Sequence, residues 1–396
     1  MTVKVTKPAI NVREELADLK KPTGIAGEAM LRAETPQEQF QLIGASRKNI
    51  IINGDMRIDQ RNNGAAVTGH ATGLFGVDRF RANENHTGSI SCQRVADAPE
   101  GFEYSNKITT TATDTSLSAT EYGRLIAPIE GNNISHLNLG SSNAKTCTLS
   151  FWVKSSLTGT FCICTFNAAA NRSMVKEYTI DVANVWEYKT IEVIGDTTGT
   201  WLTTNSAGIY ISWSLGTGTA YQTSTLNSYQ AGFKMASSSQ VNLVGTASAT
   251  WQITGVQLEV GPATPFEHRS YGEELQLCQR YFQRLEYASG SMEVGLQSSV
   301  NNGVFNLKYT RKRADPEITL PTVAAATVAN TISLLTSAGN YRSSAGTAVA
   351  DKIGIDSARV TLAGFTASGA TGDATWIYFA ASSGNPDPHI LISSEL

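Results

Sequence analysis

From about residue 49 onward, apolar and polar residues alternate in short runs separated by Gly, Pro, Asn and Ser. The clearest runs are residues 50–53, 146–153, 187–193, 208–213 and 251–259. Period-two alternation with β-branched and aromatic residues predicts strands, and about 220 residues of this pattern predict one antiparallel sandwich or jelly roll. Four tryptophans in or beside the runs are expected to fill the space between two sheets. They are Trp152, Trp186, Trp213 and Trp251.

The pattern is helical before this region. Residues 1–48 contain two short segments with helix-start signals, Asn11 before the first and Thr35 with Pro36 at the second. A segment rich in Gly and Pro joins them. Two helices this short cannot bury a core, so residues 1–48 are predicted to be an arm that either docks on something or remains mobile.

Helical spacing returns after the sandwich. Ser270 and Glu273 form a capping box that predicts a helix from Tyr271 to about Tyr287. Its apolar positions form one stripe, made of Leu275, Cys278, Tyr281, Phe282 and Leu285. Such a stripe packs either at the symmetry axis of an oligomer or against its own sandwich.

Period-two runs resume in the last part of the chain, at residues 291–297, 304–309, 358–363, 375–379 and 389–393. They predict a second, smaller sandwich, with Trp376 and Tyr378 on one strand face and expected in its core. The fold class is therefore mainly β, in four parts. These are a helical arm (1–48), a central jelly-roll-like sandwich (49–269), a linking helix (270–287) and a C-terminal β domain (288–396).

Composition and charge mainly exclude certain classes of protein and partner. Lys and Arg number 31 and Asp and Glu number 34, so the net charge is -3, and we expect no nucleic-acid partner. The N-terminus lacks the apolar segment of a signal peptide, and no run of about 18 apolar residues predicts membrane insertion. Five cysteines, an odd and sparse set, are expected to be free thiols made in a reducing cytoplasm.

Catalytic motifs do not appear in the sequence. We found no nucleophile elbow, zinc-protease motif or phosphate-binding loop, so the chain is expected not to be an enzyme and to need no cofactor. One metal hypothesis stays open. Asp55 and Asp59 near the first strand and Glu259 in the last could share a structural calcium ion, or they could cap turns.

Two groups of segments resemble a known family. Residues 49–61 with 76–80 resemble the opening of a sandwich domain common in tail fibres of tailed bacteriophages, and residues 253–269 with 271–282 resemble its close. Residues 392–396 are similar to the ends of such proteins. The family often has Trp where this chain has Ile58 or Phe80, which favours a packing role at these two positions.

The resemblance implies a carbohydrate-binding-module-like sandwich in a homotrimeric receptor-binding fibre that recognises a glycan on the host surface. The arm would attach to phage tail or portal-proximal proteins, so the expected location is the virion, after synthesis in the bacterial cytoplasm without a signal peptide. A glycan-degrading tailspike and a fibre or decoration protein of the head or neck are the alternatives.

Receptor contact is expected at the end opposite to the anchoring arm, in loops of the C-terminal domain. Polar and aromatic residues suit sugar binding, because ring faces cover C–H groups while amides and carboxylates bond hydroxyls. The candidates are Tyr341, Arg342, Asn385, Asp387 and His389.

Overall fold

The computed structural model describes residues 47–69, 73–299, 302–323, 331–336, 346–364, 374–380 and 388–396. Both predicted arm helices lie outside these residues. Residues 50–396 form one compact unit. Strands dominate its described part, with one α-helix and short 3-10 turns, which confirms the mainly β prediction.

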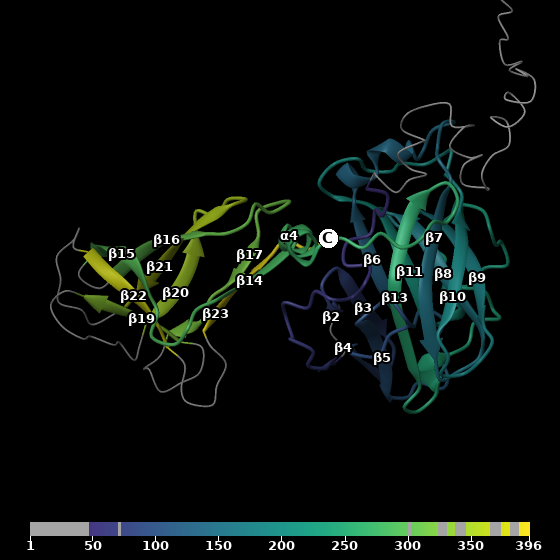
Figure 1. Ribbon diagram of the computed structural model, residues 1–396, viewed down its shortest axis with the longest axis horizontal. Coiled ribbons are helices and arrows are strands. Elements are labelled where there is room, and N and C mark those ends of the chain that lie inside the picture. The colour runs from purple at the N-terminus through teal and green to yellow at the C-terminus, as the bar shows by residue number, and fades with distance from the viewer. Residues whose placement is uncertain are drawn as a thin grey trace, which may run out of the picture. The chain divides into compact units, whose positions relative to one another are not determined.

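Two sheets form the central sandwich (Figure 1). Sheet A has the strand order β1 (Val67–Thr68), β4 (Ser89–Val95), β5 (Ser105–Ala112), β13 (Thr250–Val260), β7 (Cys147–Ser155), β10 (Glu187–Val193). Sheet B has the order β12 (Gln230–Ala231), β9 (Arg172–Ile180), β8 (Gly159–Asn167), β11 (Ala207–Thr217), β6 (Tyr122–Glu130), β3 (Phe80–Asn85), β2 (Leu74–Val77). All pairings within both sheets are antiparallel. Residues 50–53 form no strand, which corrects the first predicted run.

The 3-10 turns lie in the connections of the sandwich. Their bounds are η1 (Gly131–Asn133), η2 (Ser135–Leu137), η3 (Thr219–Tyr221) and η4 (Leu243–Gly245).

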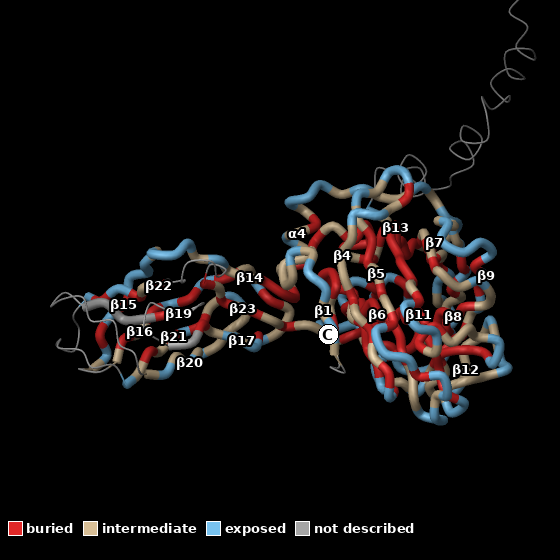
Figure 2. The backbone as a smooth tube through the Cα atoms, turned by 90° about the horizontal axis from the view of Figure 1, so that it is seen from below, coloured by how far each residue is buried: buried red, intermediate tan, exposed pale blue. Residues whose placement is uncertain are grey.

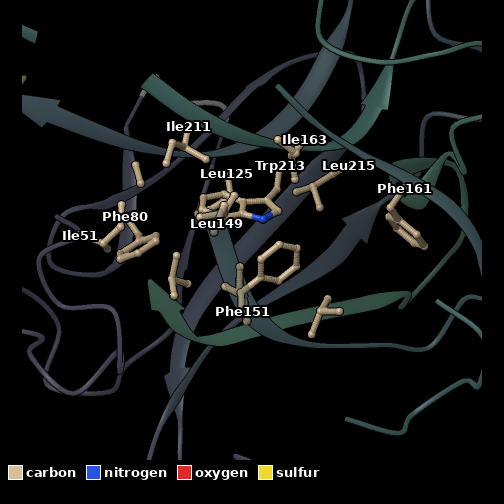
Figure 3. Packing of buried hydrophobic residues seen from close by; sticks show 14 of the residues in the cluster. Ile51, Phe80, Leu125, Leu149, Phe151, Phe161, Ile163, Ile211, Trp213 and Leu215 are labelled. Atoms are coloured by element: carbon tan, nitrogen blue, oxygen red, sulfur yellow. The ribbon is translucent and has the colours of Figure 1, made fainter. Parts of the chain in front are cut away.

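The main core lies between sheets A and B, and buried positions follow their strands (Figure 2). Trp213 is fully buried there, with ring centres 6.2 Å from Phe80 and 5.8 Å from Phe151 (Figure 3). Trp251 is fully buried as well. These two tryptophans confirm the core prediction, whereas the prediction is wrong for Trp152 and Trp186, which are only partly buried.

The outer face of sheet B is covered by the chain itself. Residues 218–242 carry Met235 and Phe233 onto outward side chains of β8 and β9, including Phe166. The result is a second apolar cluster on the far side of sheet B. All five cysteines are free thiols, as predicted, and all five are buried. The outer face of sheet A is covered in part, since Gln257 and Glu259 on β13 are buried and bond residues 264–267. The outward residues of β7 and β10 stay more open, and we consider this part of the face for ligand contact.

Two further sheets form the C-terminal part. Sheet C has the order β14 (Phe282–Glu286), β23 (His389–Ser393), β17 (Glu317–Thr319). Sheet D has the order β18 (Thr322–Val323), β19 (Thr331–Thr336), β22 (Ala374–Ala380), β15 (Met292–Ser299), β16 (Asn302–Lys308), β21 (Ser357–Ala363), β20 (Thr347–Asp351). Among the described strands of these two sheets, β18 and β19 are the only pair in parallel. Side chains of both sheets, such as Phe379 and Ile392, share one hydrophobic cluster.

The linking helix is shorter than predicted. Ser270 caps α4 (Tyr271–Gln279) by accepting the backbone N–H of Glu273, as the sequence indicated. The chain then leaves the helix, and residues 282–286 pair with β23. The prediction of a helix to residue 287 was wrong because apolar positions at 281, 282 and 285 suit a strand as well as a helix, and a distant strand decides between them. Within the described part of the chain, no helix has the length and apolar character needed to cross a membrane.

Candidate functional site

An aromatic pair lies on the outer face of sheet A. Odd-numbered residues of β7, such as Phe151, point into the core, so Trp152 points outward. Its register partner on β10 is Tyr188. The two ring centres are 5.3 Å apart with the planes tilted by 49°. Tyr188 is 44% exposed, so this pair presents aromatic surface to solvent.

Charged groups lie beside this pair. Lys154 follows Trp152 on the same face, and its Nζ is 5.0 Å from the centre of the Trp186 ring. Lys154 also forms an ion pair with Asp97, and the indole N–H of Trp186 donates to Asp97 at 3.4 Å. Burial raises the pKa of Asp97, but the hydrogen bond and positive charge of Lys154 outweigh it and hold the pKa below its usual value. The carboxylate is therefore ionised at neutral pH.

Gly255 leaves room for two aromatic rings to approach each other over the backbone of β13. Gly255 lies at an irregularity of β13 with φ of +62°, and an added Cβ there would be 2.7 Å from Phe102 and 3.1 Å from Trp152. Both rings therefore contact the bare backbone. Phe102 in turn packs against Phe266 and His268, with ring centres 5.0 and 5.4 Å away.

We call this surface the aromatic face. It consists of Phe102, Trp152, Trp186, Tyr188, Phe266 and His268 with Asp97 and Lys154. Its rings can cover the apolar C–H side of a sugar, while the carboxylate and the ammonium group can bond hydroxyls.

The predicted receptor residues are not tested by this geometry. Tyr341, Arg342, Asn385 and Asp387 lie outside the described residues. His389 opens β23 opposite Glu286 and is partly buried.

The three carboxylates of the calcium hypothesis bond groups of the protein close to them. Asp55 pairs with Arg57 at 2.7 Å, and Asp59 accepts the N–H groups of Asn62 and Gly64. Glu259 accepts the backbone N–H and the hydroxyl of Thr264 at 2.8 and 2.6 Å. Each has its own local partners, and the described residues contain no group of three His, Cys, Asp or Glu able to hold a metal. The turn-capping alternative is confirmed for Asp59.

The segments that carry the family resemblance meet at the junction of the sandwich with α4. Arg269 donates to the Ile51 carbonyl at 3.0 Å, and Glu274 accepts the N–H of Asn53 at 2.5 Å. Ile58 and Phe80, where the family often has Trp, are both buried. These segments therefore hold the fold together.

The sequence missed the aromatic face. Trp152 lies between Phe151 and Val153 in the sequence, so residue type alone suggested burial. The alternation of the strand could have identified it, because Trp152 is even-numbered whereas the core residues Leu149, Phe151 and Val153 are odd-numbered, so Trp152 points to the opposite face.

Comparisons with known proteins give similarity in fold only. The sequence matches no protein-family model, and it matches no curated protein. Among solved structures, the enzymatically active domain of tailspike protein 4 from bacteriophage CBA120 matches at 12% identity and TM-score 0.28, over 52% of this chain and 22% of that one.

Two sugar-related structures match with similar scores. The family 11 carbohydrate-binding module of a Clostridium thermocellum cellulosomal cellulase matches at 13% identity and TM-score 0.26, over 52% of this chain and 99% of that one. A putative sugar-binding protein from Bacteroides thetaiotaomicron matches at 11% identity and TM-score 0.29, over 54% of this chain and 100% of that one.

Proposed function

We propose that this chain is a non-enzymatic, glycan-binding fibre protein of a bacteriophage virion that recognises the host surface. The aromatic face carries the proposal. Partly open rings lie next to an ionised carboxylate and an ammonium group on the outer side of sheet A, an arrangement that suits polysaccharide chains. The sequence resemblance to tail fibres supplies the virion context, with residues 1–48 as the anchor to tail or portal-proximal proteins.

Binding to host cells or extracted surface polysaccharide tests the proposal. We expect the double variant Trp152→Ala and Tyr188→Ala to lose at least about tenfold in affinity, because apolar ring surface that a sugar covers contributes about 1.5–3 kcal/mol. Tyr271→Ala is the matched control, because Tyr271 is 57% exposed on α4. Equal binding by the double variant and the wild type would remove the aromatic face as the site.

Incubation with the same polysaccharide separates the fibre from its enzymatic alternative. A glycan-degrading tailspike would generate new reducing ends, whereas a binding protein would generate none. Locating the protein on the particle by electron microscopy distinguishes a tail fibre from a head or neck fibre.

Homotrimer formation belongs to the same proposal, but its contact surface differs from the one expected. The predicted helix stripe is used within the chain, since Cys278, Tyr281 and Phe282 are all buried. Sheet D instead exposes an apolar outer face, which corrects the core prediction for Trp376 and Tyr378. In register, Val294 faces Trp376 and Met292 faces Tyr378.

This outer face exposes several large apolar side chains. Val294 is 71% exposed, and Met292, Leu296 and Trp376 are 54%, 57% and 37% exposed. Monomeric proteins rarely expose a continuous apolar patch of this kind. A second copy offers the same apolar side chains, so Val294→Asp is expected to lower the mass measured by light scattering. Val182→Asp, in the connection before β10 at 54% exposure, is the control, and a monomeric wild type would contradict the trimer.

A further inference from the structure

Asp97 is a carboxylate that the fold holds in place beside the aromatic face. It lies in the connection between β4 and β5, where Ser105 Oγ donates to its backbone carbonyl at 2.6 Å. Its side chain pairs with Lys154 on β7 and accepts the indole N–H of Trp186, just before β10. Three separate parts of the chain thus fix one carboxylate, so little side-chain freedom is lost when a ligand binds to it.

The charges near the aromatic face are unequally exposed. The side chain of Asp97 is 47% exposed, whereas that of its partner Lys154 is 13% exposed. A second ion pair joins the connection before β10 to β10 itself, and here Asp181 is 69% exposed and Lys189 17% exposed. In both pairs the ammonium group is covered and the carboxylate is open. A ligand that approaches the rings therefore meets negative charge first.

The other charged residues beside the rings do not reverse this balance. Glu103, which follows Phe102 in the sequence, is exposed. Lys107 on β5 lies on the same side of sheet A and is partly buried. Lys189 is in addition neutralised by Glu187 at 2.6 Å. The accessible charge around the aromatic face is thus negative.

A fixed and open carboxylate next to aromatic rings suits hydroxyl groups and disfavours anions. The two oxygens of a carboxylate have about four acceptor positions. Lys154 and Trp186 occupy some of them, and the exposed ones can accept from a pair of hydroxyls on one sugar ring. Such bonds are charge-assisted and stronger than bonds between neutral groups. A uronate, sulfate or phosphate group would instead face like charge, and a repulsive contact of this kind discriminates against a ligand.

We propose that the aromatic face selects uncharged glycans and that Asp97 makes this selection. The rings cover the C–H side of a sugar, Asp97 accepts from its hydroxyls, and the open carboxylates disfavour acidic sugars. The inference rests on the proposed glycan-binding function and adds the class of glycan that the site takes.

Binding of the full-length protein to immobilised polysaccharides tests this selection. The probes are three matched pairs, each an uncharged polymer with an acidic form of the same backbone: methyl-esterified and free polygalacturonate, dextran and dextran sulfate, and hydroxyethyl and carboxymethyl cellulose. We expect the wild type to bind at least one uncharged polymer, and to bind it about tenfold more tightly than its acidic form. Raising NaCl from about 0.02 M to about 0.5 M should reduce this preference, because salt screens the repulsion.

Variants of the carboxylate locate the selection. Asp97→Asn is expected to bind the uncharged polymer about fivefold more weakly and to lose most of the preference, since an amide keeps one acceptor but no charge. The double variant Asp97→Asn with Lys154→Gln leaves no buried ammonium unpaired, so it covers the case in which the single variant fails to fold. Asp351→Asn is the matched control, because Asp351 is 37% exposed and pairs with Arg359 on sheet D.

The outcomes separate this inference from the proposed function. Four results overturn the inference: equal or tighter binding of the acidic polymers, a preference that salt does not change, Asp97→Asn binding like the control, or binding of no uncharged polymer. In each case, host-polysaccharide binding that is lost with Trp152→Ala and Tyr188→Ala leaves the proposed function standing. Binding of the uncharged probes as expected without binding of host polysaccharide overturns host recognition and supports the selection. A wild type that binds neither overturns both.

Discussion

Glu130→Gln tests how firmly the end of α4 is fixed to the sandwich. Glu130, the last residue of β6, is 1% exposed. It accepts from Arg280 Nε and Nη2 at 2.8 and 2.6 Å, from the Tyr281 hydroxyl at 2.7 Å and from Asn132 at 2.9 Å. Burial raises the pKa of Glu130, but the bonds from Arg280 and Tyr281 outweigh it and hold the pKa below its usual value.

The expected cost follows from these contacts. Removing one partner of a buried ion pair costs about 3–5 kcal/mol. The Arg280 side chain is 35% exposed, so water screens part of the charge it is left with. Glutamine also keeps one acceptor oxygen in place. We therefore expect Glu130→Gln to lower the free energy of unfolding by about 2–3 kcal/mol.

Urea unfolding followed by tryptophan fluorescence measures this change. A double-mutant cycle with Arg280→Ala isolates the pair, with an expected coupling above about 1 kcal/mol. Glu192→Gln is the matched control, because Glu192 is 63% exposed and 3.8 Å from Lys176, and it should change stability by less than about 0.5 kcal/mol. A Glu130→Gln effect no larger than that of the control, or a coupling near zero, would refute this account of the junction.

A glycine, a buried carboxyl group and the N-terminal arm each give a further prediction. Gly255→Ala is expected to destabilise the protein by about 2 kcal/mol in urea unfolding, because φ of +62° and the 2.7 Å approach to Phe102 both oppose a side chain; an unchanged protein would contradict this. Burial raises the pKa of Asp78 to about 6 from 3.8, so the folded state binds this proton more tightly and gains stability as pH falls through that window. The free energy of unfolding of the wild type should therefore rise relative to that of Asp78→Asn as the pH falls from 7 to 4. A difference between the two proteins that does not change with pH would refute this prediction. Deleting residues 1–48 should leave circular dichroism and melting unchanged while abolishing incorporation into particles; aggregation of the truncated protein would show that the arm belongs to the fold.

Local alternation predicted the strands well. The runs at 187–193 and 389–393 have the bounds of β10 and β23. The helix start at Ser270 was also predictable, since its cap uses only residues within one turn. These features depend on residues that are neighbours in the sequence, so the local sequence pattern is enough to predict them.

Distant contacts decided the features that local patterns did not predict. Residues 282–286 become a strand because β23 pairs with them. Asn53 turns with φ of 60° because its side chain bonds Ile58 and the Asp78 carbonyl, so residues 50–53 cannot continue as a strand. Trp152 and Trp376 were assigned to cores by residue type, whereas the register of their sheets points them outward.

The place of β23 in sheet C determines which parts of the chain can fold before synthesis is complete. This strand is the middle one of sheet C, yet it is made after both strands that it joins. Arg61 likewise can form its ion pair with Glu395 only after that residue, 334 positions later, has been synthesised. On a ribosome, the sandwich strands up to β13 can therefore assemble early, while sheet C and the contacts of Glu395 form only after release of the last segment. A chain interrupted before residue 389 would carry a folded sandwich with an unpaired β14 edge, which is a site for aggregation.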